Sequence, residues 1–341
     1  MNKWHLLPKV DLHVHLDGSL RPETVLDIAA AEGIELPASD AAGLIPYMQV
    51  DDECRSLVEY LSKFDFTTRF LQSGAALERV AYETLAQAAA HNCRYIEVRF
   101  APQLHTRNGL HPEEAIHHVI EGLKRAEKDH DIVARAIAIC MRNHNRESNL
   151  EVIEAAAKFE GRGLAAVDLA GDEASFPPEL FRDVFALAHK RALPVTIHAG
   201  EAAGAENVYE AVKNLGASRI GHGVRLRENP AILQMMAERR IPLEMCPVSN
   251  IQTKAVADWD VYPIRDYFDQ GLIITLNTDN PSVSGTDITR EYRIVSEKFD
   301  FTDAELAAII RNGANAAFLE ESAKKALKQR IEQDLQALGI K

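Results

Sequence analysis

Four short stretches of this sequence carry side chains that could bind a metal ion or move a proton. In the first, His13 and His15 stand two residues apart in VDLHVHLDG, a strand-like segment. Alternate residues of a strand point to one face, so both imidazoles would project to the same side. Two neutral imidazoles so placed can bind one divalent ion. Two partly buried histidines with polar partners would show the same spacing, and the H-x-H pattern alone leaves both interpretations open.

The other three stretches each place polar side chains where an apolar run ends. They carry His198 and Glu201 in VTIHAGE, His222 in RIGHG, and Asp279 with Asn280 in ITLNTDN. A histidine at a strand end is more often a hydrogen-bonded polar residue than a ligand, so each stretch is weak by itself. Together, imidazoles and one carboxylate suit a borderline ion such as zinc. The segment AAVDLAGDE offers no lysine to bridge a second ion, so we expect one metal ion.

The elements that must position these residues follow a regular alternation. Segments with helical spacing, several opening with proline, lie between short apolar runs that predict strands. The runs are Val10–Leu16, Tyr95–Phe100, Val133–Cys140, Ala165–Leu169, Pro194–Ile197, Arg219–Gly221, Ile241–Met245 and Ile273–Leu276. This alternation predicts a parallel sheet, and eight repeats match an α/β fold of the (β/α)8 TIM barrel type, with an open doubly wound sheet as the alternative. In a barrel the carboxyl ends of all the strands meet at one mouth, so the histidine and acidic side chains named in the preceding paragraphs would meet there too.

Two stretches exceed a simple strand-and-helix unit. Residues 23–70, after the first run, predict a lid insertion over the mouth. Within it Asp40–Val50 has loop character, and an apolar helical pattern follows. The C-terminal stretch Asp303–Leu338 predicts extra helices, with a solvated helix at Lys324–Gln336 and no chemistry. We expect residues 1–341 to form one barrel domain.

Composition excludes several classes of protein. The 341 residues carry 51 acidic and 38 basic side chains, a net charge of −13, which disfavours binding to nucleic acid. No segment approaches the roughly 20 apolar residues of a membrane helix. The four cysteines lie far apart without a C-x-x-C pair, and the N-terminal segment lacks the pattern of a secretory signal, so we expect a cytoplasmic protein with reduced thiols. A P-loop and the H-x-E…P-C-x-x-C pattern of cysteine-ligated deaminases are both absent.

Nearly end to end, the sequence resembles the adenosine deaminase family of metal-dependent barrel hydrolases. The matching motifs, in order, are KVDLHVHLDGSLRPET, SLVEYLSKFDF, YIEVRFAP, CMR, VDLAGDE, TIHAGE, RIGHGV, CPVSNIQT and LNTDNP. The resemblance implies hydrolytic deamination of adenosine or 2′-deoxyadenosine to the 6-oxopurine nucleoside plus ammonia, in purine salvage. It also implies one zinc ion per chain, held by His13, His15, His198 and Asp279.

Catalytic roles are implied for three residues. Glu201 matches the acid that protonates purine N1, and His222 the group that orients and deprotonates the attacking water; Asp279 would also fix that water. Attack at C6 breaks the aromaticity of the ring, so N1 must gain a proton, which a carboxylic acid in an apolar pocket can supply.

Substrate contacts are implied as well. Asp17 matches the position that holds the ribose 5′-hydroxyl, and Gly171 the backbone contact on the N3 side, while His15 adjoins the substrate. The residues matching an apolar lid over the base are Tyr60, Leu61 and Phe64. Asn280 stands where the family usually has Asp, whose partner is the acceptor N7. An amide always has a donor to offer, whereas a carboxyl donates only when protonated, so Asn280 could keep this contact.

Three functions remain open on the sequence. The first is deamination of adenosine and 2′-deoxyadenosine. The second is deamination of a modified adenosine, such as aminodeoxyfutalosine or a 5′-substituted nucleoside, or of free adenine, since Asn280 could also signal a changed substrate. Asp17 leaves room for ribose, although Asp17–Gly18 could instead form a simple turn. The third is a non-catalytic nucleoside-binding protein, against which the intact set of polar residues argues. The oligomeric state is not encoded in any pattern we recognise.

Overall fold

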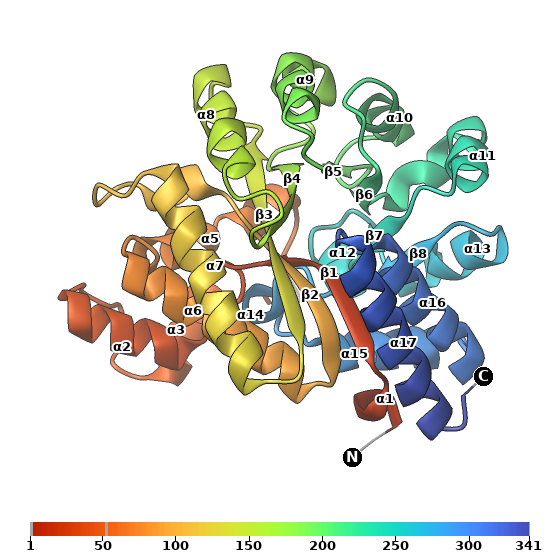
Figure 1. Ribbon diagram of the computed structural model, residues 1–341, viewed down its shortest axis with the longest axis horizontal. Coiled ribbons are helices and arrows are strands. Elements are labelled where there is room, and N and C mark those ends of the chain that lie inside the picture. The colour runs from red at the N-terminus through yellow and green to blue at the C-terminus, as the bar shows by residue number, and fades with distance from the viewer. Residues whose placement is uncertain (1–2, 52–53, 341) are drawn as a thin grey trace.

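A computed structural model describes residues 3–51 and 54–340 of the chain. Its eight strands are parallel and run in sequence order around a barrel, with helices on the outside (Figure 1). The strands are β1 (Lys9–His15), β2 (Cys93–Phe100), β3 (Val133–Met141), β4 (Leu164–Ala170), β5 (Thr196–Ala199), β6 (Arg219–His222), β7 (Leu243–Met245) and β8 (Ile274–Leu276). The predicted apolar runs and the (β/α)8 barrel are confirmed, because strands buried on both faces read as apolar runs.

The barrel consists of two four-stranded sheets, β1–β4 and β5–β8, which meet at two junctions. At one junction Val167 pairs with Val195, and at the other Val14 pairs with Asp279, each as an isolated parallel bridge. The second junction is supported by two backbone hydrogen bonds, from His15 N to Asp279 O at 2.7 Å and from Asp279 N to His13 O at 2.8 Å. Asp279 is therefore part of the closure of the barrel.

Amphipathic helices cover the outside of the strands. They are α6 (Gly74–Ala90), α7 (Pro112–Asp129), α8 (Arg146–Ala157), α9 (Arg182–Lys190), α10 (Ala205–Lys213), α11 (Pro230–Arg239) and α13 (Ile264–Asp269). Shorter helical turns follow several strands, namely η2 (Pro102–His105), η3 (Pro178–Phe181), η4 (Val224–Glu228), α12 (Pro247–Gln252), η5 (Trp259–Val261) and α14 (Pro281–Ser284). These turns surround the carboxyl ends of the strands, where the predicted site residues stand.

The insertion between β1 and α6 is helical through most of its length. It contains α2 (Pro22–Glu32), α3 (Ala41–Met48), α4 (Leu57–Leu61), α5 (Phe64–Thr67) and η1 (Thr68–Phe70), while residues 52–53 lie outside the described part. The loop predicted at Asp40–Val50 is wrong. The Asp40 carboxylate caps α3 by accepting a hydrogen bond from Gly43 N, and Leu44 and Met48 bury one face, which outweighs the helix-breaking effect of Pro46.

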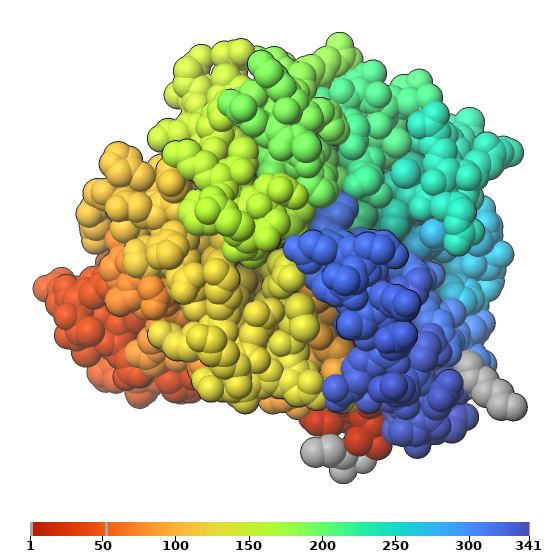
Figure 2. Space-filling model, in the orientation of Figure 1, coloured from red at the N-terminus to blue at the C-terminus, as the bar shows by residue number. Residues whose placement is uncertain are grey.

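At the other end of the chain, helices complete the covering layer. They are α15 (Ile288–Lys298), α16 (Asp303–Ala316) and α17 (Glu321–Ala337), and α1 (Lys3–Leu6) precedes the barrel. Helix α17 buries Leu327, Ile331 and Leu335 on one face and is tied to β2 by Arg94 and Asp334, 2.7 Å apart. Its outer face forms part of the surface in Figure 2, in dark blue. Among the described helices, none is long and apolar enough to cross a membrane.

Candidate metal centre and active site

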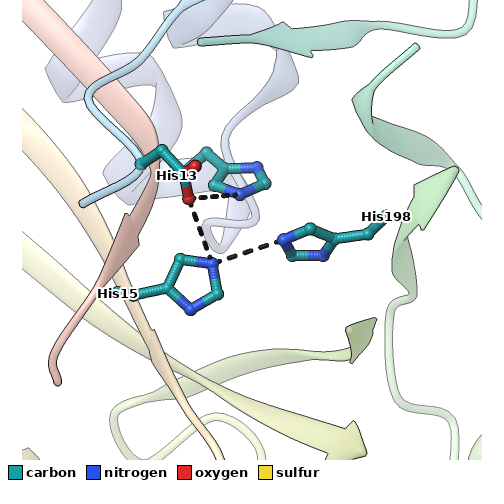
Figure 3. Close-up of side chains that lie close together, drawn as sticks. His13, His15 and His198 are labelled. Carbon is teal, nitrogen blue, oxygen red and sulfur yellow. Dashed lines mark hydrogen bonds and ion pairs between the residues drawn. The ribbon is translucent and has the colours of Figure 1, made fainter. Parts of the chain in front are cut away.

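Four side chains from distant parts of the sequence converge at the mouth of the barrel. His13 and His15 come from β1, His198 from β5, and Asp279 from the segment after β8. One ligand atom of each lies within 4.8 Å of the others, and Figure 3 shows the imidazoles of His13, His15 and His198 turned toward a common centre. The two closest contacts place His15 Nε2 at 3.3 Å from His198 Nε2 and at 3.3 Å from Asp279 Oδ1. The structure thus brings together the four predicted ligands.

Buried carboxylates fix which ring nitrogen faces this centre. His13 Nδ1 lies 2.8 Å from Glu244 Oε2, and His198 Nδ1 lies 3.0 Å from Asp168 Oδ2. Each Nδ1 therefore carries the proton, and each Nε2 presents a lone pair to the centre. His198 Nε2 thus offers its lone pair to the centre, 3.3 Å from His15 Nε2, where a cation between the two nitrogens would be bound by both. His13 Nε2 is likewise buried and makes no hydrogen bond within residues 3–51 and 54–340. This donor set fits a divalent metal ion.

Behind the ligands, one guanidinium joins the two orienting carboxylates. Arg99 on β2 donates to Asp168 Oδ2 at 2.9 Å and to Glu244 Oε2 at 2.8 Å, and all three side chains are fully buried. Arg219 binds the second oxygen of Glu244 at 2.6 Å. Because carboxylates this deeply buried need compensating charge, the two arginines keep them ionised. These residues carry no local sequence signal, since their contacts join strands that are far apart in sequence.

His222 and Glu201 face each other beside the ligand cluster. His222 Nε2 lies 3.6 Å from Glu201 Oε2, and the two residues are 1% and 5% exposed. Burial raises the pKa of Glu201 well above its usual range, with the negative charges of Asp279 and Glu173 adding to the effect. Burial holds the pKa of His222 well below its usual range. Both shifts favour the protonated form of the Glu201 carboxyl group and the uncharged form of the His222 imidazole.

The short helix α12 supplies a second layer of hydrogen bonds. Ser249 Oγ donates to Asp279 Oδ2 at 2.5 Å, and Asn250 Nδ2 lies 2.9 Å from His222 Nδ1. Tyr262 donates in turn to Asn250 Oδ1 at 3.0 Å. Because the tyrosine hydroxyl both donates and accepts, reversing the Asn250 amide also satisfies all three groups and moves the His222 proton to Nδ1. The motif CPVSNIQT was the sequence signal for this layer, but its spacing did not reveal these contacts.

Two site residues lie on backbone that L-residues rarely adopt. His222 has a φ of 63° and Asp279 a φ of 59°, both in the left-handed region. Gly221 allows the ligands to approach closely, since a Cβ there would lie 3.0 Å from His13 Cε1. The chain thus turns sharply at the strand ends and aims both side chains into the mouth.

Asp17 and Asn280 adjoin Asp279 of this centre, and Gly171 follows the end of β4. Asp17 and Asn280 are 5% and 3% exposed, and Oδ1 of each lacks a hydrogen-bond partner in the described residues. Burial raises the pKa of Asp17 to about 7. A Cβ on Gly18 would lie 2.1 Å from Asn280 Oδ1, so the Asp17–Gly18 segment packs directly against Asn280. Gly171 follows β4 with a φ of 107°, which favours glycine.

The three predicted lid residues differ in their surroundings. Tyr60 on α4 is buried, packs with Val50, Cys54 and Val283, and its hydroxyl lies 2.6 Å from Ser284 Oγ on α14. Leu61 and Phe64 are half-buried. Helix α4 is therefore attached to the barrel through Tyr60, and its neighbours remain partly accessible.

All four cysteines are buried and unpaired. One of them, Cys246, brings its sulfur within 4.8 Å of ligand atoms of His222 and Asp279. Its thiol donates to the carbonyl oxygen of Glu244 at 3.5 Å, and burial raises its pKa well above the usual range. A protonated thiol is a poor ligand, so the imidazole and carboxylate set is the better candidate.

Comparison with known proteins agrees with this geometry. The family model described as adenosine deaminase matches residues 8–334. An adenosine deaminase from Clostridium botulinum (strain 657 / Type Ba4) is 44% identical over 326 residues, covering 96% of this chain and 98% of the relative. The crystal structure of an adenine deaminase from Arthrobacter aurescens superposes with a TM-score of 0.90 at 27% identity, covering 97% and 99% of the chains. A Burkholderia ambifaria amidohydrolase with bound Zn gives a TM-score of 0.88 at 26% identity, covering 98% and 93%. The chain therefore belongs to the adenosine deaminase family.

Proposed function

We propose that this protein is a metal-dependent aminohydrolase that converts adenosine and 2′-deoxyadenosine to inosine and 2′-deoxyinosine, releasing ammonia. The observation that supports this most directly is the pairing of Glu201 and His222, 3.6 Å apart, beside four converging ligand donors. A protonated acid, a neutral base and a metal site are the three groups that hydrolysis of an aromatic amine needs.

One zinc ion would be held by His13, His15, His198 and Asp279. When bound, a divalent ion supplies a Lewis acid that lowers the pKa of water from about 15.7 to about 7, so that a nucleophile exists at neutral pH. Glu244 and Asp168 keep two of the imidazoles in the tautomer that offers Nε2. Ser249 holds one oxygen of Asp279 and leaves the other for the centre.

The remaining steps belong to side chains of the chain. His222 takes a proton from the attacking water at Nε2, in the tautomer where Nδ1 donates to the reversed amide of Asn250. Glu201 gives its proton to purine N1 as the water oxygen attacks C6 and the ring loses aromaticity. His222 then gives its proton to the 6-amino group, which leaves the tetrahedral carbon as ammonia. The proton of the new C6 hydroxyl passes to the Glu201 carboxylate, so that the 6-oxopurine remains and both side chains are restored.

Other residues would bind the nucleoside. The unpartnered Oδ1 of Asp17 can accept a hydrogen bond from the ribose 5′-hydroxyl, and Asn280 can donate through its amide nitrogen to N7. The backbone N–H of Gly171 would address the N3 side, His15 adjoins the substrate, and the apolar cover over the base would come from Tyr60, Leu61 and Phe64. These contacts support a nucleoside as the substrate, and we propose a cytoplasmic enzyme whose chain acts as one catalytic domain.

Substrate turnover tests this proposal. Purified protein loaded with zinc is incubated with adenosine, 2′-deoxyadenosine, adenine and a 5′-substituted adenosine, and the ultraviolet shift to the 6-oxopurine is followed. We expect the highest kcat/KM for the two nucleosides. A large advantage for adenine or the 5′-substituted compound would replace the substrate, and no turnover of any of them would reject the activity.

Replacement of the acid tests the chemistry. Glu201→Gln keeps the shape of the side chain but cannot supply the proton, so kcat should fall by about 10³-fold while the metal content is unchanged. Elemental analysis and the same ultraviolet assay measure both. Unchanged turnover would contradict the assigned role.

A further inference from the structure

The loop that carries Glu201 is held by a carboxylate that the mechanism above does not use. Glu173 lies two residues beyond Gly171 in the loop after β4 and is 2% exposed. Its carboxylate accepts hydrogen bonds from five donors, four in the loop after β5 and one in the first turn of α10. These are Gly200 N at 2.8 Å, Glu201 N at 3.0 Å, Ala202 N at 2.8 Å, Ala203 N at 3.1 Å and Asn207 Nδ2 at 3.1 Å.

Four consecutive backbone N–H groups that point at one position form an anion-binding concavity. Here the anion is a side chain of the protein itself. Within residues 3–51 and 54–340 no lysine or arginine lies within ion-pair distance of Glu173. The buried guanidinium of Arg142 interacts with it electrostatically, and the backbone N–H groups supply four of the five hydrogen bonds. Hydrogen bonds to a charged acceptor are stronger than neutral ones, and buried N–H groups left without an acceptor would cost free energy. The conformation of the loop therefore depends on this one carboxylate.

The opposite side of the same loop is held by Arg225. Arg225 N donates to Gly200 O, and Arg225 Nη1 donates to Ala202 O, both at 2.9 Å. Gly200 itself has a φ of 70°, and a Cβ there would lie 2.7 Å from Val208 Cγ2. With its amides and its carbonyls both fixed, the loop leaves the Glu201 side chain little freedom of position.

From these contacts we infer that Glu173 is a positioning residue for the proton donor, which locks the loop after β5 to the loop after β4. The inference rests on the proposed function, because it assigns Glu201 to N1 and Gly171 to the N3 side of the same ring. Strands β4 and β5 are neighbours across a junction of the barrel (Figure 1), where a single bridge joins the backbones. Asp168 and His198 connect the two strands within the barrel, and Glu173 connects the loops that follow them. Its negative charge also raises the pKa of Glu201, after burial and the charge of Asp279.

The direct test is Glu173→Gln in the full-length, zinc-loaded protein. The amide has the same shape, but its NH2 group would face backbone donors, so some of the five hydrogen bonds to this side chain are lost. A misplacement of about 1 Å can cost about 100-fold in rate, and we expect kcat for adenosine to fall by that factor, with a smaller change in KM and unchanged metal content. Glu210→Gln is the matched control, since Glu210 is a buried carboxylate on α10 that binds Arg182 at 2.7 Å. That variant should keep its kcat.

A double variant separates positioning from a purely structural role. If Glu173 acts through Glu201, Glu173→Gln added to Glu201→Gln should lower the residual kcat no further. A second full loss in the double variant would overturn the inference. So would a Glu173→Gln protein that has a lower Tm but a normal kcat at a temperature where it is folded.

A milder change keeps the test decisive if Glu173→Gln does not fold. Asn207→Ala removes one donor to Glu173 and places the best helix former in the first turn of α10. We expect a several-fold loss of kcat, and an unchanged kcat would overturn the inference. Normal turnover by Glu201→Gln would instead reject the proposed function, so the two failures are distinguishable.

Discussion

The two sheets of the barrel differ in the length of their strands and in the chemistry they carry. Strands β1–β4 have 7, 8, 9 and 7 residues, whereas β5–β8 have 4, 4, 3 and 3. The first sheet contributes His13 and His15 from β1. The second sheet and the segments that follow it contribute the other side chains proposed as metal ligand, acid or base, which are His198, Glu201, His222 and Asp279.

The difference shows two ways of fixing a functional side chain. In β1 the ladder with β2 pairs His15 with Arg99, whereas His13 lies at the irregularity between Asp11 and Val14, where Glu244 holds its Nδ1. In the second half the chain leaves the sheet early, and side-chain hydrogen bonds replace the ladder. Ser249 holds Asp279, Asn250 holds His222, and Glu173 holds the loop of Glu201. Substitutions in the packing of the short-strand half should therefore change activity more than equivalent substitutions in the long-strand half.

The largest effect is expected from removing a ligand of the second half. His198→Ala deletes one imidazole of the centre, so metal affinity should fall at least 100-fold and turnover by more than about 10³-fold. Elemental analysis after dialysis and the ultraviolet assay measure the two losses. His105→Ala is the control, because His105 is a buried histidine of the first half whose Nδ1 lies 2.9 Å from Leu71 O. Equal metal loss in both variants would mean that the assignment of ligands is wrong.

Matched core substitutions compare the two sheets directly. Ile96 in β2 and Ile220 in β6 are 1% and 0% exposed, and either isoleucine-to-alanine change should cost about 2–5 kcal/mol of unfolding free energy. Ile220 stands two residues before His222, so Ile220→Ala should also lower kcat by about tenfold in the folded protein. Ile96→Ala should leave kcat nearly unchanged. Urea unfolding and kcat at low temperature test this, and equal kcat values would remove the contrast between the sheets.

The pH dependence of stability tests the contact between Glu291 and α12. Glu291 on α15 accepts hydrogen bonds from Val248 N and Thr286 Oγ1, and burial raises its pKa from 4.5 to about 8. The native state keeps this proton after the unfolded chain has lost it. The free energy of unfolding should therefore fall as pH rises from about 4.5 to about 8. Glu291→Gln should lessen that fall, measured as urea unfolding at pH 5, 7 and 9. Parallel curves for the two proteins would show that Glu291 does not titrate as described.

The smallest effect is expected at Asn280, where the second half meets Gly18 of the first. Asn280→Asp replaces the amide by a carboxyl group of the same shape, and we expect kcat/KM for adenosine within about threefold at its optimum. A carboxyl must be protonated to donate to N7, so the variant should lose kcat/KM more steeply than the unmodified enzyme as pH rises. Overlapping pH profiles would show that Asn280 does not donate to N7.

Much of this architecture was predictable from the sequence, for physical reasons. Doubly buried strands appear as apolar runs, and even β3, with Ala134, Ala136 and Ala138, keeps that character. The four proposed ligands were expected from the family resemblance and from their places in or just after the predicted strands. Helix α3 was not, since the turn-forming and helix-breaking residues at Asp40 and Pro46 conceal its buried face. The supporting residues Arg99, Glu173 and Asn250 were not identified either, because their partners lie in other strands and loops and leave no local pattern.

The distribution of the ligands has a mechanical consequence. An ion held by His13 and His15 on one side and by His198 and Asp279 on the other would connect the two sheets, close to the bridge between Val14 and Asp279. Its binding free energy then adds to the cohesion of the scaffold. Treatment with a chelator should accordingly speed amide hydrogen exchange at His15 and Asp279 before it affects the interior of β2 and β3. The same ion would then serve the reaction and stabilise the closed barrel.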